Sequence, residues 1–157
     1  MRNLMSKAFV ALAITTVAAF GADNSIGTWK LNVEKSKFTP GPFPVKSLTT
    51  VRESISGGVK MTNTGARTDG TPINASVTLK YDGTAVAVTG TGAPYDTVAV
   101  KQVDANTFTS ETKKNTGPYH GTARTVISKD GKTMTTTTKG TDGDGKPFTS
   151  TLVYDKQ

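Results

Sequence analysis

The chain has 157 residues, no cysteine, one tryptophan and a formal net charge of +7. Without cysteine it forms no disulfide and carries no lipid on a lipobox cysteine, and its length suits one domain. The basic residues are spread along the chain and are not interleaved with aromatic residues, which argues against a nucleic-acid-binding protein in spite of the high pI.

Residues 1–21 have the three parts of a secretory signal peptide. Arg2 and Lys7 give a positive start, residues 8–20 form an apolar stretch of 13 residues, and small residues follow at the cleavage site. A stretch of this length is too short to span a bilayer of about 30 Å. An N-terminal core helix is the alternative. We expect a signal peptide followed by one exported domain, residues 22–157, which is periplasmic or secreted and has no membrane span.

The rest of the chain has the pattern of short strands separated by tight turns. Thr, which is β-branched and prefers strands, occurs 29 times. Turn sequences such as Asp69-Gly70, Asp82-Gly83 and Asp130-Gly131 recur at short intervals. Between the turns lie ten candidate strands, at 26–33, 47–56, 59–67, 73–81, 85–90, 95–103, 107–114, 119–128, 133–141 and 147–156. This pattern predicts an all-β antiparallel meander.

Closure of the meander decides its architecture. A single antiparallel up-and-down β-barrel of about 8–10 strands removes the exposed sheet edges, and a two-sheet sandwich with the same hairpins is the alternative. Two sets of alternating residues share a face: Ile73, Ala75, Val77, Leu79 and Tyr81 in one strand, and Phe148, Ser150, Leu152 and Tyr154 in another. The Thr-rich strand at 133–141 alternates too weakly for its inward face to be assigned.

The longest break between predicted strands spans residues 34–46 and contains three prolines. Proline lacks an N–H and restricts the residue before it, so this stretch cannot be a helix. It predicts an extended loop that crosses one end of the barrel. Phe38 and Phe43 in this loop either plug that end or line the mouth of a ligand site.

Several segments carry a family resemblance. Gly27-Thr28-Trp29-Lys30-Leu31 resembles the opening strand of the calycins, which include the lipocalin and fatty-acid-binding barrels. With the segments at 35–38, 128–135 and 139–142, the chain resembles a group of uncharacterised exported bacterial lipocalin-like proteins. The resemblance implies a β-barrel whose interior binds a small molecule.

The resemblance also assigns structural roles at the base of the barrel. In calycins the tryptophan of the first strand closes the base, often beneath a basic side chain from a late strand. Here it implies that Gly27 and Trp29 belong to the base, with Arg124 or Lys156 as the covering cation. In fatty-acid-binding proteins an arginine of the last strand receives the ligand carboxylate. Leu152 stands at that place here, so fatty acid is not carried over as the ligand.

Polar residues that share a face with apolar ones are the candidates for ligand contact. Asn63 and Arg67 have the parity of Val59 and Met61, so both are expected to point inward or to lie at the rim. A buried Arg requires an anion or an internal acid. Three tyrosines add hydroxyl groups to a mostly apolar pocket, namely Tyr81, Tyr95 and Tyr154. In the alternative, Arg67 extends to solvent and the tyrosines belong to the core.

Catalytic and metal-binding patterns are scarce. His120 is the single histidine and is expected at the rim, and no Gly-x-Ser-x-Gly elbow accompanies it. Asp142-Gly143-Asp144-Gly145 begins like a calcium loop, but Lys146 takes the next acidic place, so a hairpin turn is expected. We expect no catalytic residue, no metal site and no cofactor.

Together these observations favour an exported lipocalin-like protein that binds a small, partly apolar molecule, hydrophobic or amphipathic, inside the barrel. The alternative is a barrel filled by its own side chains. Such a barrel would act as an interaction module and contact envelope polymers or a partner protein through its basic surface.

Overall fold

The computed structural model describes residues 22–157, and the predicted signal peptide, residues 1–21, lies outside the described residues. The described chain contains twelve strands and no helix, hence none long and apolar enough to cross a membrane. The strands are β1 Gly27–Leu31, β2 Lys37–Thr39, β3 Val45–Ile55, β4 Gly58–Arg67, β5 Pro72–Leu79, β6 Asp82–Ala87, β7 Thr89–Thr91, β8 Thr97–Asp104, β9 Thr107–Lys113, β10 His120–Ile127, β11 Thr133–Thr141 and β12 Pro147–Lys156. The prediction of an all-β fold is confirmed.

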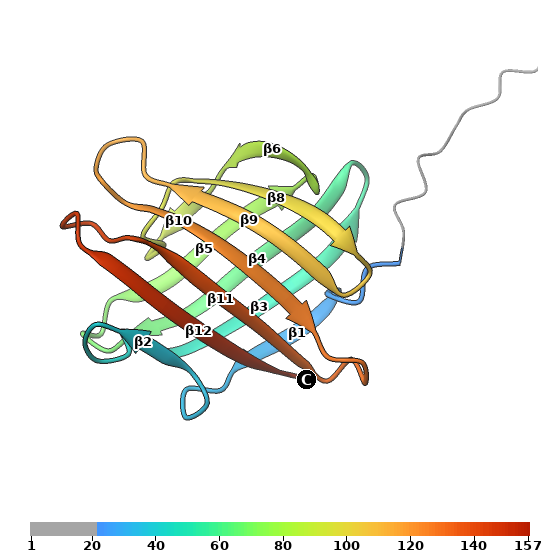
Figure 1. Ribbon diagram of the computed structural model, residues 1–157. Helices are drawn as coiled ribbons and strands as arrows, with labels where there is room; N and C mark the ends of the chain where they lie inside the picture. The colour runs from blue at the N-terminus through green and yellow to red at the C-terminus, as the bar shows by residue number, and fades with distance from the viewer. Residues whose placement is uncertain (1–21) are drawn as a thin grey trace, which may run out of the picture.

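One sheet contains all the strands and curls into a nearly closed antiparallel barrel (Figure 1). Its order is β6-β8-β9-β10-β11-β12-β1-β3-β4-β5-β7, and β2 pairs with β12 beside this path. The first and last long strands meet in the middle of the sheet, where Trp29 lies opposite Lys156. The predicted single up-and-down barrel is thus confirmed, and the architecture is compatible with a calycin-like fold.

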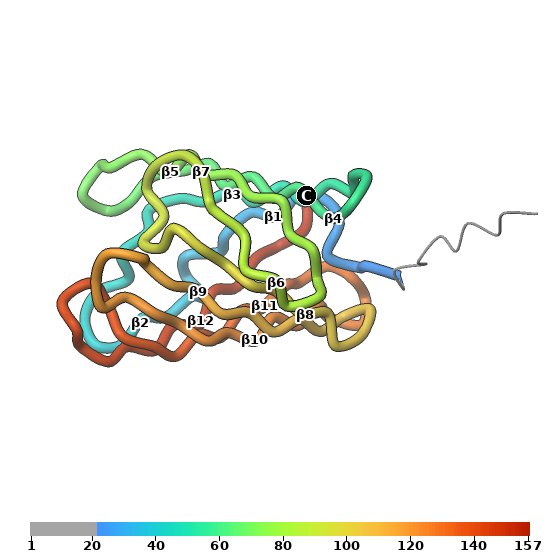
Figure 2. The backbone as a smooth tube through the Cα atoms, turned by 90° about the horizontal axis from the view of Figure 1, so that it is seen from above, coloured from blue at the N-terminus to red at the C-terminus, as the bar shows by residue number. Residues whose placement is uncertain are grey.

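The barrel closes through residues 82–91. The first part of this stretch, β6, pairs with β8, and the second part, β7, pairs with β5. Figure 2 shows a flattened barrel in which this stretch crosses from the layer of β8 to the layer of β5. One stretch of chain therefore connects the two edges of the sheet. The closure of the barrel is incomplete because β6 does not pair with β5.

The number of strands differs from the ten predicted for two reasons. The segment predicted at 85–90 forms two strands, β6 and β7, because it changes its pairing partner along its length. In addition, β2 forms within the stretch predicted as loop, where Lys37–Thr39 pairs with Thr149–Thr151 of β12. This pairing joins residues far apart in the sequence, and a strand of three residues is too short to show a pattern of alternation.

Alternation along the strands determines what fills the barrel. In β5 the predicted inward residues, from Ile73 to Leu79, are all buried. In β12 the predicted set has buried ends, Phe148 and Tyr154, and half-buried residues between them. The largest fully buried side chains gather near one end of the barrel: Trp29, Leu79, Phe108 and Met134. This packed end is the base, and the opposite end carries the Pro-rich loop.

Candidate functional site: a cavity inside the barrel

The barrel contains a cavity of about 440 Å³ between the packed base and the Pro-rich loop. This volume lies within the range of small-molecule sites, roughly 300–1,000 Å³. The alternative of an interior filled by side chains therefore does not describe this barrel.

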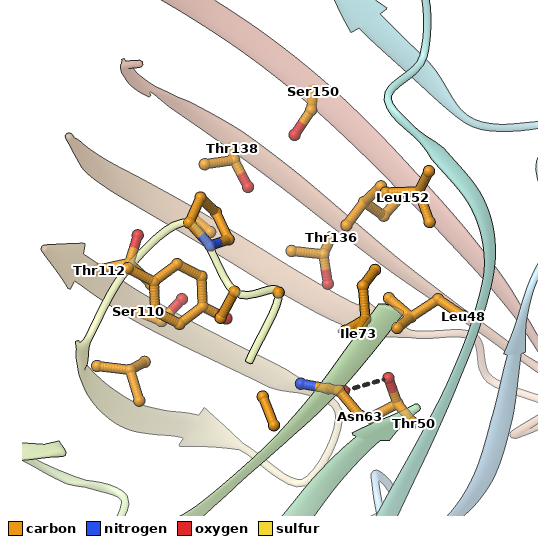
Figure 3. A pocket seen from close by; sticks show the side chains of 18 of the residues that line it. Leu48, Thr50, Asn63, Ile73, Ser110, Thr112, Thr136, Thr138, Ser150 and Leu152 are labelled. Carbon is orange, nitrogen blue, oxygen red and sulfur yellow. Dashed lines mark hydrogen bonds between the residues drawn. The ribbon is translucent and has the colours of Figure 1, made fainter. Parts of the chain in front are cut away.

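Two walls of different chemistry face each other across the cavity. One wall, on β9 to β12, presents hydroxyl groups: Ser110, Thr112, Thr125, Thr136, Thr138 and Ser150. The opposite wall, on β3 to β5, presents mostly apolar groups, among them Leu48, Met61, Ile73 and Ala75. Figure 3 shows Ser110, Thr112, Thr136, Thr138 and Ser150 on the far strands, and Leu48, Thr50, Asn63 and Ile73 on the near side. Such a cavity fits a molecule that is apolar on one side and forms hydrogen bonds on the other.

Aromatic rings line the mouth. Tyr95 stacks on Tyr119 with 6.0 Å between ring centroids, and Tyr119 stacks on Phe148 at 5.9 Å. Phe148 in turn stacks on Phe38 of β2 at 5.5 Å. Phe43 also lines the cavity. Phe38 and Phe43 were expected either to plug this end of the barrel or to line the mouth of a ligand site. The structure places both side chains on the cavity wall at the mouth.

Asn63 and Arg67, two of the predicted ligand-contact residues, lie on the cavity wall in β4. The Oγ1 of Thr50 donates a hydrogen bond of 2.7 Å to Oδ1 of Asn63, drawn as a dashed line in Figure 3. The guanidinium of Arg67 donates through Nε and Nη2 to the carbonyl oxygen of Gly92, at 3.2 and 2.7 Å. Arg67 therefore ties the end of β4 to the loop that carries Tyr95 over the mouth.

The three predicted tyrosines occupy different depths. Tyr95 and Tyr154 line the cavity, whereas Tyr81 lies in the base, where its hydroxyl is 3.1 Å from Oγ of Ser25. Burial raises the pKa of Tyr95 to about 12. Burial also raises the pKa values of Tyr81 and Tyr154 above the ordinary 10.0. All three phenols are thus held in the neutral form at physiological pH, in which the hydroxyl is a hydrogen-bond donor.

The base is built around Trp29, which is 0% exposed. Its Nε1 donates a hydrogen bond of 2.8 Å to the carbonyl oxygen of Ser25. Nζ of Lys156 lies 5.1 Å from the ring centroid. The side chain of Lys156 also passes so close to Gly27 that a Cβ at residue 27 would lie 2.9 Å from its Cε. Of the two cations considered as cover for the indole, Lys156 occupies this position.

Arg124 does not belong to the base, contrary to the expectation that grouped it with Gly27 and Trp29. In β10 the buried residues are Gly121, Thr125 and Ile127, so Arg124 has the outward parity and is exposed. Its side chain lies on the outer face beside Lys101 and Lys139. The calycin resemblance implied a cation from a late strand at the base, and the alternation of β10 excludes Arg124 from that position.

Arg52 is a cavity residue that the sequence interpretation missed. It lies in β3 opposite Met61 and lines the cavity with Leu48 and Thr50, which share its parity. Arg52 lies two residues from Thr50 and four from Leu48, so alternation along the strand predicts the same inward face for all three side chains. The weak apolar character of the strand at 47–56 concealed the inward face.

The candidate metal ligands and the single histidine do not gather at one place in residues 22–157. No group of three His, Cys, Asp or Glu side chains within residues 22–157 is placed to hold a metal ion. His120 is exposed at the start of β10. No protein-family model matches the sequence, and a search of curated proteins finds no match. The cavity is therefore the feature from which a function has to be argued.

Proposed function

We propose that this is an exported, non-catalytic barrel protein that binds a small, partly apolar molecule in its interior, in the periplasm or outside the cell. The single observation that carries the proposal is the cavity of about 440 Å³, with a hydroxyl-bearing wall opposite a mostly apolar wall that also holds Arg52, Asn63 and Arg67. A cavity of this kind loses stabilising contacts when empty, and an apolar ligand restores them. The leader-like residues 1–21 support export.

The proposal is tested with phenylnaphthylamine, a neutral dye that fluoresces on entering an apolar site. The variant Thr138→Trp places an indole in the cavity, because Thr138 lies on its wall. We expect dye affinity to fall about ten-fold or more, since the indole occupies space that the ligand needs.

Thr137→Trp is the matched control. Thr137 is the preceding residue of β11 and is exposed on the outer face. This variant should bind the dye like the unmodified protein. Equal dye binding by both variants, with both folded, would refute binding inside the barrel.

A further inference from the structure

Arg52 is a half-buried side chain on the cavity wall, and two of its nitrogens lack hydrogen-bond partners. Its Nε and Nη1 atoms are buried and have no partner among residues 22–157. Its guanidinium carbon lies 6.0 Å from the ring centroid of Phe108, which belongs to the packed base. A cation–π contact offsets part of the cost of burying a cation but satisfies neither N–H group.

No carboxylate in residues 22–157 is hydrogen-bonded to the buried Nε or Nη1 of Arg52. Arg67, the other cation on the cavity wall, donates to Gly92, and Asp142 lies in the hairpin between β11 and β12 at the mouth. Asp23 lies at the base, where its Oδ1 accepts a hydrogen bond from the Ser25 amide. The buried Oδ2 of Asp23 has no partner in the described chain, so it does not bond to Arg52.

The charge of Arg52 acts on three buried phenols. It opposes the rise of the pKa values of Tyr81, Tyr95 and Tyr154 that burial causes. A phenol hydroxyl and a guanidinium are both donors toward an oxyanion. Tyr154 lines the cavity with Arg52, whereas Tyr81 lies in the base beside Asp23 and Tyr95 lies at the mouth. The cavity therefore offers positive charge and a phenol donor below an aromatic mouth.

We propose, building on the proposed function, that the interior ligand carries an oxyanion such as a carboxylate, sulfonate or phosphate ester, and that Arg52 binds this group. The planar guanidinium matches two oxygens of an oxyanion at once. Its Nε and Nη1 are buried from the cavity, so the anion is expected to meet the guanidinium at Nη2. The apolar part of the ligand then extends along β3 to β5 toward the aromatic mouth.

Two dyes separate the anion from the apolar ring system. Anilinonaphthalene sulfonate has the rings of phenylnaphthylamine plus one sulfonate group. The unmodified protein should bind the sulfonate dye more tightly than the neutral dye. In Arg52→Gln, affinity for the sulfonate dye should fall roughly ten- to hundred-fold, the range of a charge-assisted hydrogen bond, and affinity for the neutral dye should change little.

Arg124→Gln is the matched control, since it removes the same charge from the outer face. It should leave the affinities for both dyes unchanged. Equal losses for both dyes in Arg52→Gln, or an unchanged preference for the sulfonate, would overturn the assignment to Arg52. If the neutral dye still enters the barrel by the Thr138→Trp criterion, such a result refutes the anion site alone, and the proposed function stands.

Arg52→Met distinguishes ligand binding from a structural role. Replacing a half-buried cation that has two unpartnered nitrogens by an apolar side chain of similar length should leave thermal stability unchanged or raise it, because no partly desolvated charge remains. The same variant should lose the preference for the sulfonate dye. If Arg52→Met and Arg52→Gln both fail to fold, Arg52 is a structural residue and the proposal is wrong.

Discussion

Arg52 and Arg67 line the same cavity but differ in their hydrogen bonding. Arg67 donates twice to the carbonyl oxygen of Gly92, so its charge is held by the mouth loop. Two nitrogens of Arg52 have no acceptor in the described part of the chain. A buried donor without a partner lowers stability, and natural proteins contain few of them. Asp23 of the base also has a buried oxygen without a partner, but of these two residues only Arg52 lines the cavity, where a ligand could bind it.

The tyrosines allow a prediction about alkaline pH. Burial raises the pKa of Tyr95 to about 12, whereas an unfolded tyrosine has the ordinary value of 10.0. Below pH 10 both states hold the proton and the stabilising effect is complete. Between pH 10 and 12 the unfolded state releases the proton first, so the free energy of unfolding should fall, by at most about 1.4 kcal/mol per pH unit for this residue.

Urea denaturation at a series of pH values measures this fall, and near-ultraviolet absorbance reports tyrosinate. Tyr95→Phe should show a shallower dependence on pH. Burial raises the pKa of Tyr81, Tyr119 and Tyr154 as well, so they should add to the effect. Tyrosinate formation in the folded protein with a midpoint near 10.0 would contradict the prediction.

At the element scale, the stretch that closes the barrel depends on glycine. In β7, Gly90 has a φ of +99°, and a Cβ at this position would lie 2.0 Å from the carbonyl oxygen of Asn74 in β5. Only glycine combines this conformation with such a close approach of two backbones. The pairing of β7 with β5, and with it the closure of the barrel beside the mouth loop, therefore requires glycine here.

Gly90→Ala should lower the free energy of unfolding by roughly 2–4 kcal/mol, because the methyl group strains φ and displaces β5. Chemical denaturation measures the loss. Gly143→Ala is the control, since no atom lies within 4 Å of the added Cβ and φ is not in the left-handed region. The control should stay within about 0.5 kcal/mol of the unmodified protein. Equal stability of the two variants would show that β7 does not need glycine.

At the scale of the whole molecule, the two ends of the barrel serve different purposes. The base is packed around Trp29, and the mouth is lined by aromatic rings around an open cavity. The first residues of the described chain belong to the base: the carbonyl of Ala22 accepts from Gln102, the amide of Asn24 donates to Ala105, and Ser25 meets both Trp29 and Tyr81. Removal of the predicted signal peptide therefore has to cut the chain before Ala22 if these contacts are to remain.

We therefore expect the mature protein to begin at Ala22. Cleavage after Gly21 follows the small-residue pattern of a signal peptidase site and leaves the contacts of residues 22–25 in place. N-terminal sequencing and intact mass of protein recovered from the periplasm or the medium of expressing bacteria test this. Recovery of the full chain from the cytoplasm alone would contradict export, and a start beyond Ser25 would contradict the structural argument.

Local patterns in the sequence determined the all-β class, most strand positions and the inward faces of β5 and β12. They do so because turn residues and a period of two act over neighbouring residues. The same parity placed Asn63 and Arg67 on the cavity wall. It would have placed Arg52 there as well, and it would have directed Arg124 outward had it been applied to β10.

Tertiary structure alone decided which residues from different strands meet. The pairing of β2 with β12, the change of partner between β6 and β7, and the choice of Lys156 as the cation at Trp29 all depend on how the sheet curls and closes. The cavity and the unpartnered nitrogens of Arg52 follow from the same closure. Contacts across a closed barrel join residues far apart in the chain, and their partners cannot be read from any one strand.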